Sequence, residues 1–225
     1  MVKQIMQCDI NRIRNLLRTA KHFLICTGAG MSADSGVPVY HTKEGLWGSD
    51  YTKTYEHYGL TAEKVQEFGR TGTFSENYWD FWRYFLDQHL YFGSVQLHPG
   101  YDALNKIVGD DYYVVTSNID GAHIRSGLDA NRVLECHGAL TATGPLGRGI
   151  PVQCVDGSRC NKEPWIHYFP MYVQSSKELE EHYLPRCMSC EKVARPNYLS
   201  FNDQNCLIGS FGLESPVRRE MKNWL

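Results

Sequence analysis

The chain has 225 residues, of which 42% are hydrophobic and 21% are charged, and its formal net charge is −2 at pH 7. A chain of this size can bury one sizeable core together with a small satellite domain. The charge balance argues against a globally basic surface for nucleic acid or anionic lipid, and no apolar run is long enough to span a bilayer. Residues 1–10 lack the apolar core of a signal peptide, so we expect a cytoplasmic protein without direct nucleic-acid or membrane contacts, the nucleus remaining open.

The first expected helix covers Asp9–Ala20, with Asp9 as its N-cap. Its apolar residues recur with helical spacing on one face: Ile10, Ile13, Leu16 and Leu17. Because this helix directly precedes an apolar strand, we expect that face to pack on the sheet.

A strand-like run from His22 to Cys26 ends in a Gly-Ala-Gly turn at Gly28–Gly30, and a short helix is expected to follow. Glycine at positions 28 and 30 lets the backbone turn tightly and expose N–H groups. The positive end of the following helix would then attract an anion such as a diphosphate. The third glycine of the dinucleotide-binding fingerprint is replaced by Ala33, so the turn alone also fits a purely structural role.

The chain after Gly36 departs from the pattern of a dehydrogenase, whose second parallel strand follows within about 30 residues. Instead, His41–Gly48 indicates a loop, and helices are expected over Thr61–Arg70 and Ser75–Phe92. The second helix carries eight aromatic residues, so we expect it to be clamped between the sheet and a neighbouring layer. Residues 41–97 are therefore predicted to form a helical insertion over the Gly-Ala-Gly turn.

The middle of the chain is predicted to add two strands that end in polar turns. A helix is expected from Pro99 to about Val108, a strand at Tyr112–Thr116, a short helix ending near Gly127 and a strand at Arg132–Cys136. The first strand leads into the polar segment Ser117–His123 and the second into His137-Gly138. Three polar turns at the carboxyl ends of parallel strands predict an α/β protein with a Rossmann-like sheet and ligands along one rim.

Eight cysteines without a secretory signal favour metal binding over disulfides for closely spaced pairs. Cys187-x-x-Cys190 has the spacing of half a zinc site, and Cys154 and Cys160 are the expected other half, although five residues separate them. Four thiolates would form a closed structural site, and free thiols without metal are the alternative. The remaining cysteines are assigned to core or surface: Cys8, Cys26, Cys136 and Cys206.

Several motifs together resemble the sirtuins, the NAD-dependent protein deacylases, in order and approximate spacing. They are Gly28-Ala-Gly-Met-Ser32, Thr116-Ser-Asn-Ile-Asp-Gly121, Glu135-Cys-His-Gly138 and, after a Cys-x-x-Cys, Arg195-Pro-Asn-Tyr-Leu-Ser-Phe-Asn-Asp203. The last is similar to the family's acyl-lysine-binding segment. The Ala-Arg-Pro-Asn and Thr-Ser-Asn forms resemble a bacterial-type branch.

The resemblance implies removal of acyl groups from protein lysines, with release of nicotinamide and O-acyl-ADP-ribose. A general base must remove a proton from a ribose hydroxyl, and His137 suits this role because unperturbed imidazole titrates near pH ~6.5. The alternative is a buried histidine bonded to a backbone carbonyl. Asn118 and Asp120 would orient the ribose and a water, although an Asx-type turn is also common after a strand.

The resemblance assigns NAD to a set of rim residues: Gly28, Ala29, Gly30, Ser32, Pro38, Tyr40, His41, Ser117, Asn118, Ile119 and Asp120. Leu199 and Phe201 would bind the acylated lysine of a protein or peptide substrate. The chain departs from the family pattern where serine replaces glutamine at 117, valine replaces aspartate at 39 and histidine replaces arginine at 41. Because valine cannot bond the carboxamide of nicotinamide, binding would weaken by about 1–3 kcal/mol.

The implied organisation is a Rossmann-like NAD-binding domain over 1–138 and 194–225, a zinc-binding module over 139–193 with a helix at Ser175–Tyr183, and the insertion 41–97 over the cofactor site. After a helix from Ser215-Pro216 through Met221 the chain ends before the later strands of a sirtuin sheet. We expect a fragment of a longer protein, a partner chain that supplies those strands, or a decayed fold. A binding or scaffold protein without turnover, or an ADP-ribosyltransferase or NAD hydrolase, therefore stands beside the deacylase.

Overall fold

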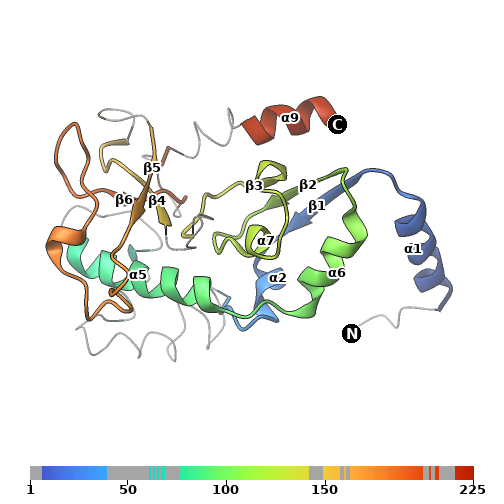
Figure 1. Ribbon diagram of the computed structural model, residues 1–225, viewed down its shortest axis with the longest axis horizontal. Coiled ribbons are helices and arrows are strands. Elements are labelled where there is room, and N and C mark those ends of the chain that lie inside the picture. The colour runs from blue at the N-terminus through green and yellow to red at the C-terminus, as the bar shows by residue number, and fades with distance from the viewer. Residues whose placement is uncertain are drawn as a thin grey trace.

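The computed structural model describes residues 7–39, 61, 63, 65, 67–68, 77–141, 149–157, 160, 163–199, 203, 206–207 and 216–225. Within these residues it contains two three-stranded sheets, one in each of two lobes (Figure 1). We call them the parallel-sheet lobe and the small-sheet lobe. Within the same ranges, the helices are all too short or too polar to cross a membrane.

The parallel-sheet lobe is built on β1 (Phe23–Thr27), β2 (Tyr112–Thr116) and β3 (Val133–Glu135), in the order β1-β2-β3. All pairings are parallel, and the last residues of the three strands, Thr27, Thr116 and Glu135, lie in register. The carboxyl ends of the strands therefore meet at one edge, which faces the small-sheet lobe (Figure 1). This confirms the predicted Rossmann-like sheet and its shared rim.

Helices cover the two faces of the parallel sheet because its side chains alternate between them. On one face, α6 (Pro99–Val108) and α7 (Ala122–Arg125) contribute to an apolar cluster that contains Phe23, Ile25, Leu104, Val108, Tyr112, Val114, Ile124, Leu128 and Val133. On the other face, α9 (Pro216–Trp224) contributes to a cluster that contains Tyr113, Val115, Leu134, Val217, Met221 and Trp224. Leu24 of β1 stays 45% exposed, so within the described chain α9 leaves β1 partly uncovered.

Helix α1 (Gln7–Thr19) forms nearly where it was expected but does not pack as expected. Its four apolar residues are 38–57% exposed. The predicted packing on the sheet is wrong: α6, α7 and α9 supply the helical residues of the two sheet-face clusters, whereas α1 lies beyond them at one end of the molecule (Figure 1). Asp9 lies in the first turn of the helix, where its carboxylate interacts favourably with the positive end of the helix dipole.

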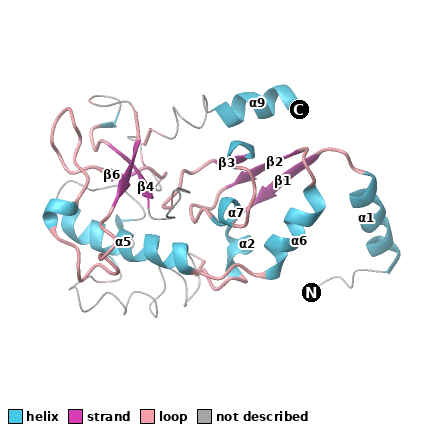
Figure 2. Ribbon diagram, in the orientation of Figure 1, coloured by secondary structure: helices cyan, strands magenta, loops and turns pink. Residues whose placement is uncertain are grey.

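The small-sheet lobe contains β4 (Gly149–Gln153), β5 (Trp165–Tyr168) and β6 (Arg195–Pro196), antiparallel in the order β5-β4-β6. Figure 2 shows β4 and β6 beside α5 and apart from the parallel sheet. The aromatic helix α5 (Tyr78–Ser94) shares its core with this sheet. Phe81 packs edge-on against Phe68 at 5.4 Å between ring centroids, and the Trp82 indole N–H donates to the Ala194 carbonyl at 2.9 Å. The helix is clamped as expected, but by the small sheet rather than the parallel one.

The segment expected to be helical at Ser175–Tyr183 forms two separate turns instead. The Ser175 N–H and hydroxyl donate to the Glu178 carboxylate at 2.7 and 2.8 Å, as at the start of a helix. Glu180 then adopts extended angles, φ −121° and ψ 151°, and only the single 3₁₀ turn η4 (Glu181–Tyr183) follows. The predicted helix over Ser175–Tyr183 is therefore wrong, because the extended Glu180 ends it after its first turn.

Candidate functional site

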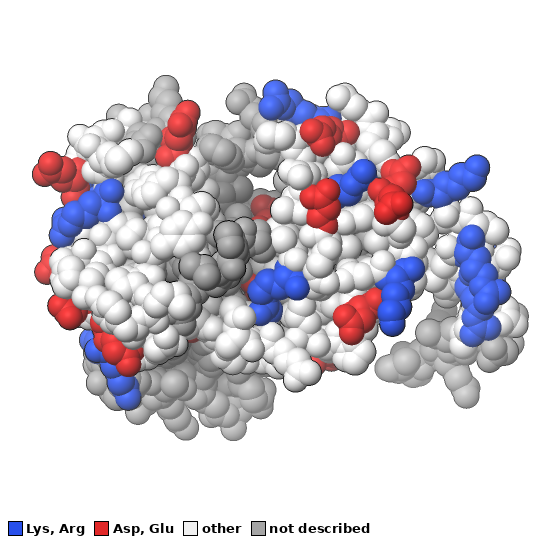
Figure 3. All heavy atoms as spheres, in the orientation of Figure 1, with Lys and Arg blue, Asp and Glu red and all other residues white. Residues whose placement is uncertain are grey.

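The three polar turns at the rim contact one another. Helix α2 (Ala29–Ala33) follows β1 directly. The Asn118 side chain donates to the Gly28 carbonyl at 3.0 Å, and His137 Nδ1 lies 3.1 Å from the Ser117 carbonyl oxygen. On the face drawn in Figure 3, the surface is hollowed between the two lobes, and acidic and basic side chains are interspersed.

The amide of Asn118 has its orientation fixed by two acceptors. Its Nδ2 lies 3.0 Å from the Gly28 carbonyl and 3.0 Å from the Ser32 hydroxyl, and the residue is 9% exposed. Both N–H groups of the amide are therefore used within the protein. Its Oδ1 remains as the acceptor available to a bound molecule.

Asp120 belongs to the same hydrogen-bonded group as Asn118, because both side chains bond the Ser32 hydroxyl. One carboxylate oxygen accepts from the Ser32 hydroxyl at 2.5 Å and the other from the Ala122 N–H at 2.9 Å. Because the single hydroxyl hydrogen of Ser32 points at Asp120, the Tyr101 hydroxyl, 3.2 Å away, must donate to Ser32. Burial raises the pKa of Tyr101, which keeps it a donor.

His137 is exposed and lies beside the segment expected to bind substrate. Because its Nδ1 faces the Ser117 carbonyl, the Nδ1 proton is donated there and Nε2 carries a free lone pair in the neutral ring. The His137 carbonyl accepts from the Leu199 N–H at 2.8 Å, and Gly138 forms an antiparallel bridge with Tyr198. The ring is thus bonded to a carbonyl, as the structural alternative holds, yet it is accessible, as a base must be.

Of the two glycines in the Gly-Ala-Gly turn, Gly28 alone has a neighbour that a side chain would crowd, and this is not the reason expected for it. Gly28 has extended backbone angles, φ −151° and ψ −165°, which any residue can adopt. A Cβ at position 28 would lie 3.2 Å from the Ser117 hydroxyl, whereas one at position 30 would meet open space. The predicted conformational need for glycine at position 28 is wrong; a side chain there would instead crowd the Ser117 hydroxyl of the turn after β2.

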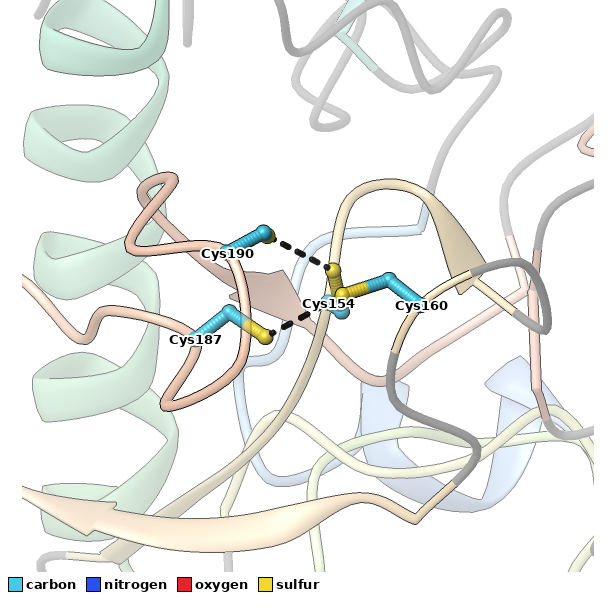
Figure 4. A group of neighbouring side chains, drawn as sticks. All are labelled: Cys154, Cys160, Cys187 and Cys190. Carbon is cyan, nitrogen blue, oxygen red and sulfur yellow. Dashed lines mark hydrogen bonds between the residues drawn. The ribbon is translucent and has the colours of Figure 1, made fainter.

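Four cysteines converge in the small-sheet lobe (Figure 4). Their Sγ atoms all lie within 4.8 Å of one another; Cys154 and Cys190 are 3.6 Å apart and Cys160 and Cys187 3.7 Å apart. A tetrahedral zinc with Zn–S distances of about 2.3 Å requires sulfurs about 3.8 Å apart. The donor set therefore fits zinc in a closed structural site, as predicted, despite the long Cys154–Cys160 gap.

The backbone holds this cysteine cluster from two sides. Cys154 directly follows β4, and Cys187 begins a turn in which its N–H donates to the Lys192 carbonyl at 2.9 Å. Glu191 takes a positive φ of 61° in that turn. The Lys192 ammonium joins the two halves of the site by donating to Asp156 at 2.8 Å.

Comparison with known proteins decides the family. The model of the Sir2 family matches residues 28–206, which include the rim and all four clustered cysteines. The chain belongs to the Sir2 family.

Its relatives in that family include an NAD-dependent protein deacetylase of Chromobacterium violaceum, 30% identical over 89% of this chain and 69% of the relative. An NAD-dependent protein deacylase of Pyrococcus abyssi is 26% identical over 86% of this chain and 66% of the relative. A solved sirtuin structure on substrate affinity superposes with a TM-score of 0.61 at 22% identity, over 96% of this chain and 72% of that one. This Sir2-family chain thus spans roughly two thirds of the proteins it matches.

The remaining predicted site residues are only partly placed. In this Sir2-family chain Ile119 is buried, Pro38 and Val39 are half-buried after α2, and Leu199 is 41% exposed. Tyr40, His41 and Phe201 lie outside the described residues. The ligand contacts of all these residues stay predictions.

Sequence reasoning missed several polar residues beneath the rim of this Sir2-family chain. Thr27 donates to the Thr116 hydroxyl at 2.9 Å, and His123 Nε2 lies 2.8 Å from the Thr27 hydroxyl. Glu135 ends β3, where burial and then the Asp120 charge raise its pKa to about 8. The sequence signal for Thr27, Thr116 and Glu135 was their position at or next to the carboxyl end of a predicted strand, before a polar turn.

Proposed function

We propose that this Sir2-family chain carries the reaction centre of an NAD-dependent protein lysine deacylase. One observation carries the proposal: the accessible His137 ring is bonded through Nδ1, its Nε2 has no partner among the described residues, and it lies on the same rim as Asn118 and Asp120. The relatives named as NAD-dependent deacetylases and deacylases, and a solved complex described as a Sir2 homolog with NAD, support NAD as the co-substrate.

The residues of the rim would divide the chemistry between them. NAD, when bound, supplies the ribose carbon that loses nicotinamide. Asn118 Oδ1 would accept a hydrogen bond from a ribose hydroxyl or an ordered water, since both of its N–H groups are engaged. His137 Nε2 would take a proton from a ribose hydroxyl, a general-base step worth about 10²–10⁴-fold.

The substrate would be an acylated lysine in an extended peptide that lies beside Leu199. A solved structure described as Sir2 bound to acetylated peptide, with a TM-score of 0.54, supports this class of substrate. In this chain the backbone N–H of Leu199 donates a hydrogen bond to the backbone carbonyl of His137. The proposed substrate-binding segment and the proposed base are therefore direct neighbours. This contact supports binding of the acyl group close to the rim.

The test compares His137→Ala and Asn118→Ala with the exposed-histidine control His182→Ala. We expect His137→Ala to lose about 10²–10⁴-fold in deacylation, the range for one general base, while NAD affinity changes little. Asn118→Ala should slow nicotinamide release itself. The assay follows nicotinamide and deacylated peptide separately, with NAD binding by calorimetry, and equal, unimpaired rates in both variants would overturn the assignment.

Val39 supports a second candidate, a binding protein that holds NAD without turnover. Its apolar side chain follows α2 at a position where it cannot accept a hydrogen bond from a carboxamide. An unmutated chain that binds NAD but releases no nicotinamide would favour this candidate. Release without any acylated peptide would instead favour an NAD hydrolase.

The edge of β1 supports the proposal of a further strand from this polypeptide or a partner. In the described ranges β1 pairs with β2 alone, and Leu24 and Cys26 on it are exposed. A strand added at this edge would complete the backbone hydrogen bonds of β1. Thiol labelling of Cys26 should then slow on assembly, and unchanged labelling would contradict the added strand.

A further inference from the structure

We infer that His123 is a positioning residue of the rim, which acts on Asn118 through the hydroxyls of Thr27 and Thr116. The inference rests on the proposed function for its kinetic consequence but not for its geometry. His123 lies in α7, directly after the turn that carries Asn118 and Asp120. Among the described residues, the His123 side chain is hydrogen-bonded to Thr27 and not to Asn118 itself.

The connection runs through three hydrogen bonds beneath the rim. His123 Nε2 lies 2.8 Å from the Thr27 hydroxyl, which donates to the Thr116 hydroxyl at 2.9 Å. The backbone N–H of Asn118 donates to the same Thr116 hydroxyl at 3.1 Å. His123 and Thr116 are each 2% exposed, so water cannot readily replace these bonds.

The protons of this chain can be placed by counting donors. The single hydroxyl hydrogen of Thr27 goes to Thr116, so Thr27 can only accept from the histidine. His123 must therefore carry its proton on Nε2. Its Nδ1 is buried and has no hydrogen-bond partner in the described part of the chain. Burial also lowers the pKa of His123, against the opposing effect of Asp120, which favours the neutral ring that this arrangement requires.

These bonds determine where Asn118 sits. Its backbone is held at Thr116, while its side chain is held at Gly28 and Ser32. Thr27 and Thr116 are paired residues at the ends of β1 and β2, so His123 fastens the two strand ends together under the turn. Because a misplacement of about 1 Å can cost on the order of 10²-fold in rate, a loose backbone at Asn118 should slow the step that releases nicotinamide.

The competing explanation is that His123 only fills space in the core, where its ring packs edge-on against Tyr101 at 5.3 Å. Two substitutions separate the explanations. His123→Phe keeps the ring volume and removes the donor, whereas His123→Gln loses the ring and places an amide N–H near the position of Nε2. A space-filling role favours phenylalanine, and a positioning role favours glutamine.

Two substitutions of Thr27 provide a second test that leaves His123 unchanged. Thr27→Val keeps the shape of the side chain and removes the hydroxyl, and Thr27→Ser keeps the hydroxyl. Positioning predicts that Thr27→Val behaves like His123→Phe and that Thr27→Ser behaves like the unmutated chain. This pair decides the question if His123→Phe does not fold.

The experiment measures nicotinamide release and amide hydrogen exchange at Asn118 in all four variants, with thermal unfolding as the check on folding. We expect His123→Phe and Thr27→Val to lose about 10–100-fold in kcat with the KM for NAD changed less than about threefold. His123→Gln and Thr27→Ser should stay within about threefold of the unmutated chain. The double variant His123→Phe with Thr27→Val should be no slower than either single variant, because both break one chain of bonds.

The exchange measurement keeps this inference separate from the proposed function. If the unmutated chain shows no turnover, the deacylase proposal fails. Exchange at the Asn118 N–H should still accelerate in His123→Phe and Thr27→Val, but not in the conservative variants His123→Gln and Thr27→Ser. Unchanged exchange in folded His123→Phe or Thr27→Val overturns the inference. So does a His123→Gln variant that is as impaired as His123→Phe.

Discussion

The rim and the cysteine cluster differ in what holds their side chains in place. At the rim, Ser32, Asn118 and Asp120 bond one another, so the arrangement is satisfied by the polypeptide itself. In the cysteine cluster, four sulfurs face one another 3.6–3.7 Å apart in the closest pairs, and a metal ion is what would bind all four. The side chains of the rim are thus bonded to one another, whereas the backbone brings the four thiolates together and a metal would be their common partner.

This difference separates the two sites in how they should fail. Loss of one hydrogen-bonding group at the rim leaves its neighbours partly satisfied and costs about 1–3 kcal/mol. Loss of one thiolate removes a ligand on which the folding of the small-sheet lobe depends. Single substitutions should therefore impair the rim in function and the cluster in stability.

The largest effect is expected for Cys187→Ser. Structural zinc contributes roughly 10–16 kcal/mol of apparent binding energy in small modules, which exceeds the whole stability of many domains. We expect bound zinc to fall from one per chain to nearly none and the small-sheet lobe to lose its near-ultraviolet circular dichroism. Cys26→Ser, an exposed cysteine of β1, is the matched control and should keep its zinc. Retained zinc and an unchanged unfolding temperature in Cys187→Ser would mean that the cluster holds no structural metal.

An intermediate effect is expected for Glu135→Gln at the rim, and it should depend on pH. Because burial raises the folded-state pKa of Glu135 from 4.5 to about 8, the folded chain binds a proton that the unfolded chain has lost between these values. The free energy of unfolding should therefore fall as pH rises from about 4.5 to 8. Glutamine cannot ionise, so the variant should gain on the order of 1–3 kcal/mol over the unmutated chain at pH 9 and little at pH 4.5.

Chemical denaturation at the two pH values measures this difference. Glu220→Gln, on the exposed side of α9, is the control and should change neither value appreciably. An equal effect of Glu135→Gln at both pH values would show that ionisation at the rim does not contribute to stability.

The smallest effect is expected for Lys192→Met, which breaks the ion pair between the two halves of the cysteine cluster. The partners are 2.8 Å apart, but their side chains are 58% and 39% exposed, so solvent screens the attraction. We therefore expect the free energy of unfolding to change little, with zinc retained. Zinc loss in this variant would show that the ion pair, and not only the four thiolates, is required for zinc binding.

The sequence predicted best those elements whose signals are local. Helix α6 begins at Pro99 and strand β2 covers Tyr112–Thr116, as expected, because a helix-start proline and a β-branched run depend on few neighbours. The cysteine cluster was predictable because ligand spacing carries its chemistry. The rim was predictable as a place, since parallel strands bring their carboxyl ends together.

Tertiary contacts explain what the sequence did not show. The apolar face of α1 could be predicted from the sequence. Which helices pack on the sheet could not, because that depends on distant parts of the chain. The hydrogen bonds of Thr27 join it to residues 89 and 96 positions away, and no local pattern reports such contacts. The role of Gly28 escaped prediction for the same reason, because it depends on Ser117 across the sheet edge.

The packing of α5 limits how this chain can be divided for engineering. The helix precedes the small-sheet lobe by more than fifty residues, yet it supplies Phe81, Trp82 and Phe85 to the core of that lobe, and its Trp82 bonds Ala194. A chimera that exchanges only residues 139–193 would therefore leave a foreign sheet on a native helix. Transplanting the metal module into another scaffold would require α5 to travel with it, as one unit of two segments.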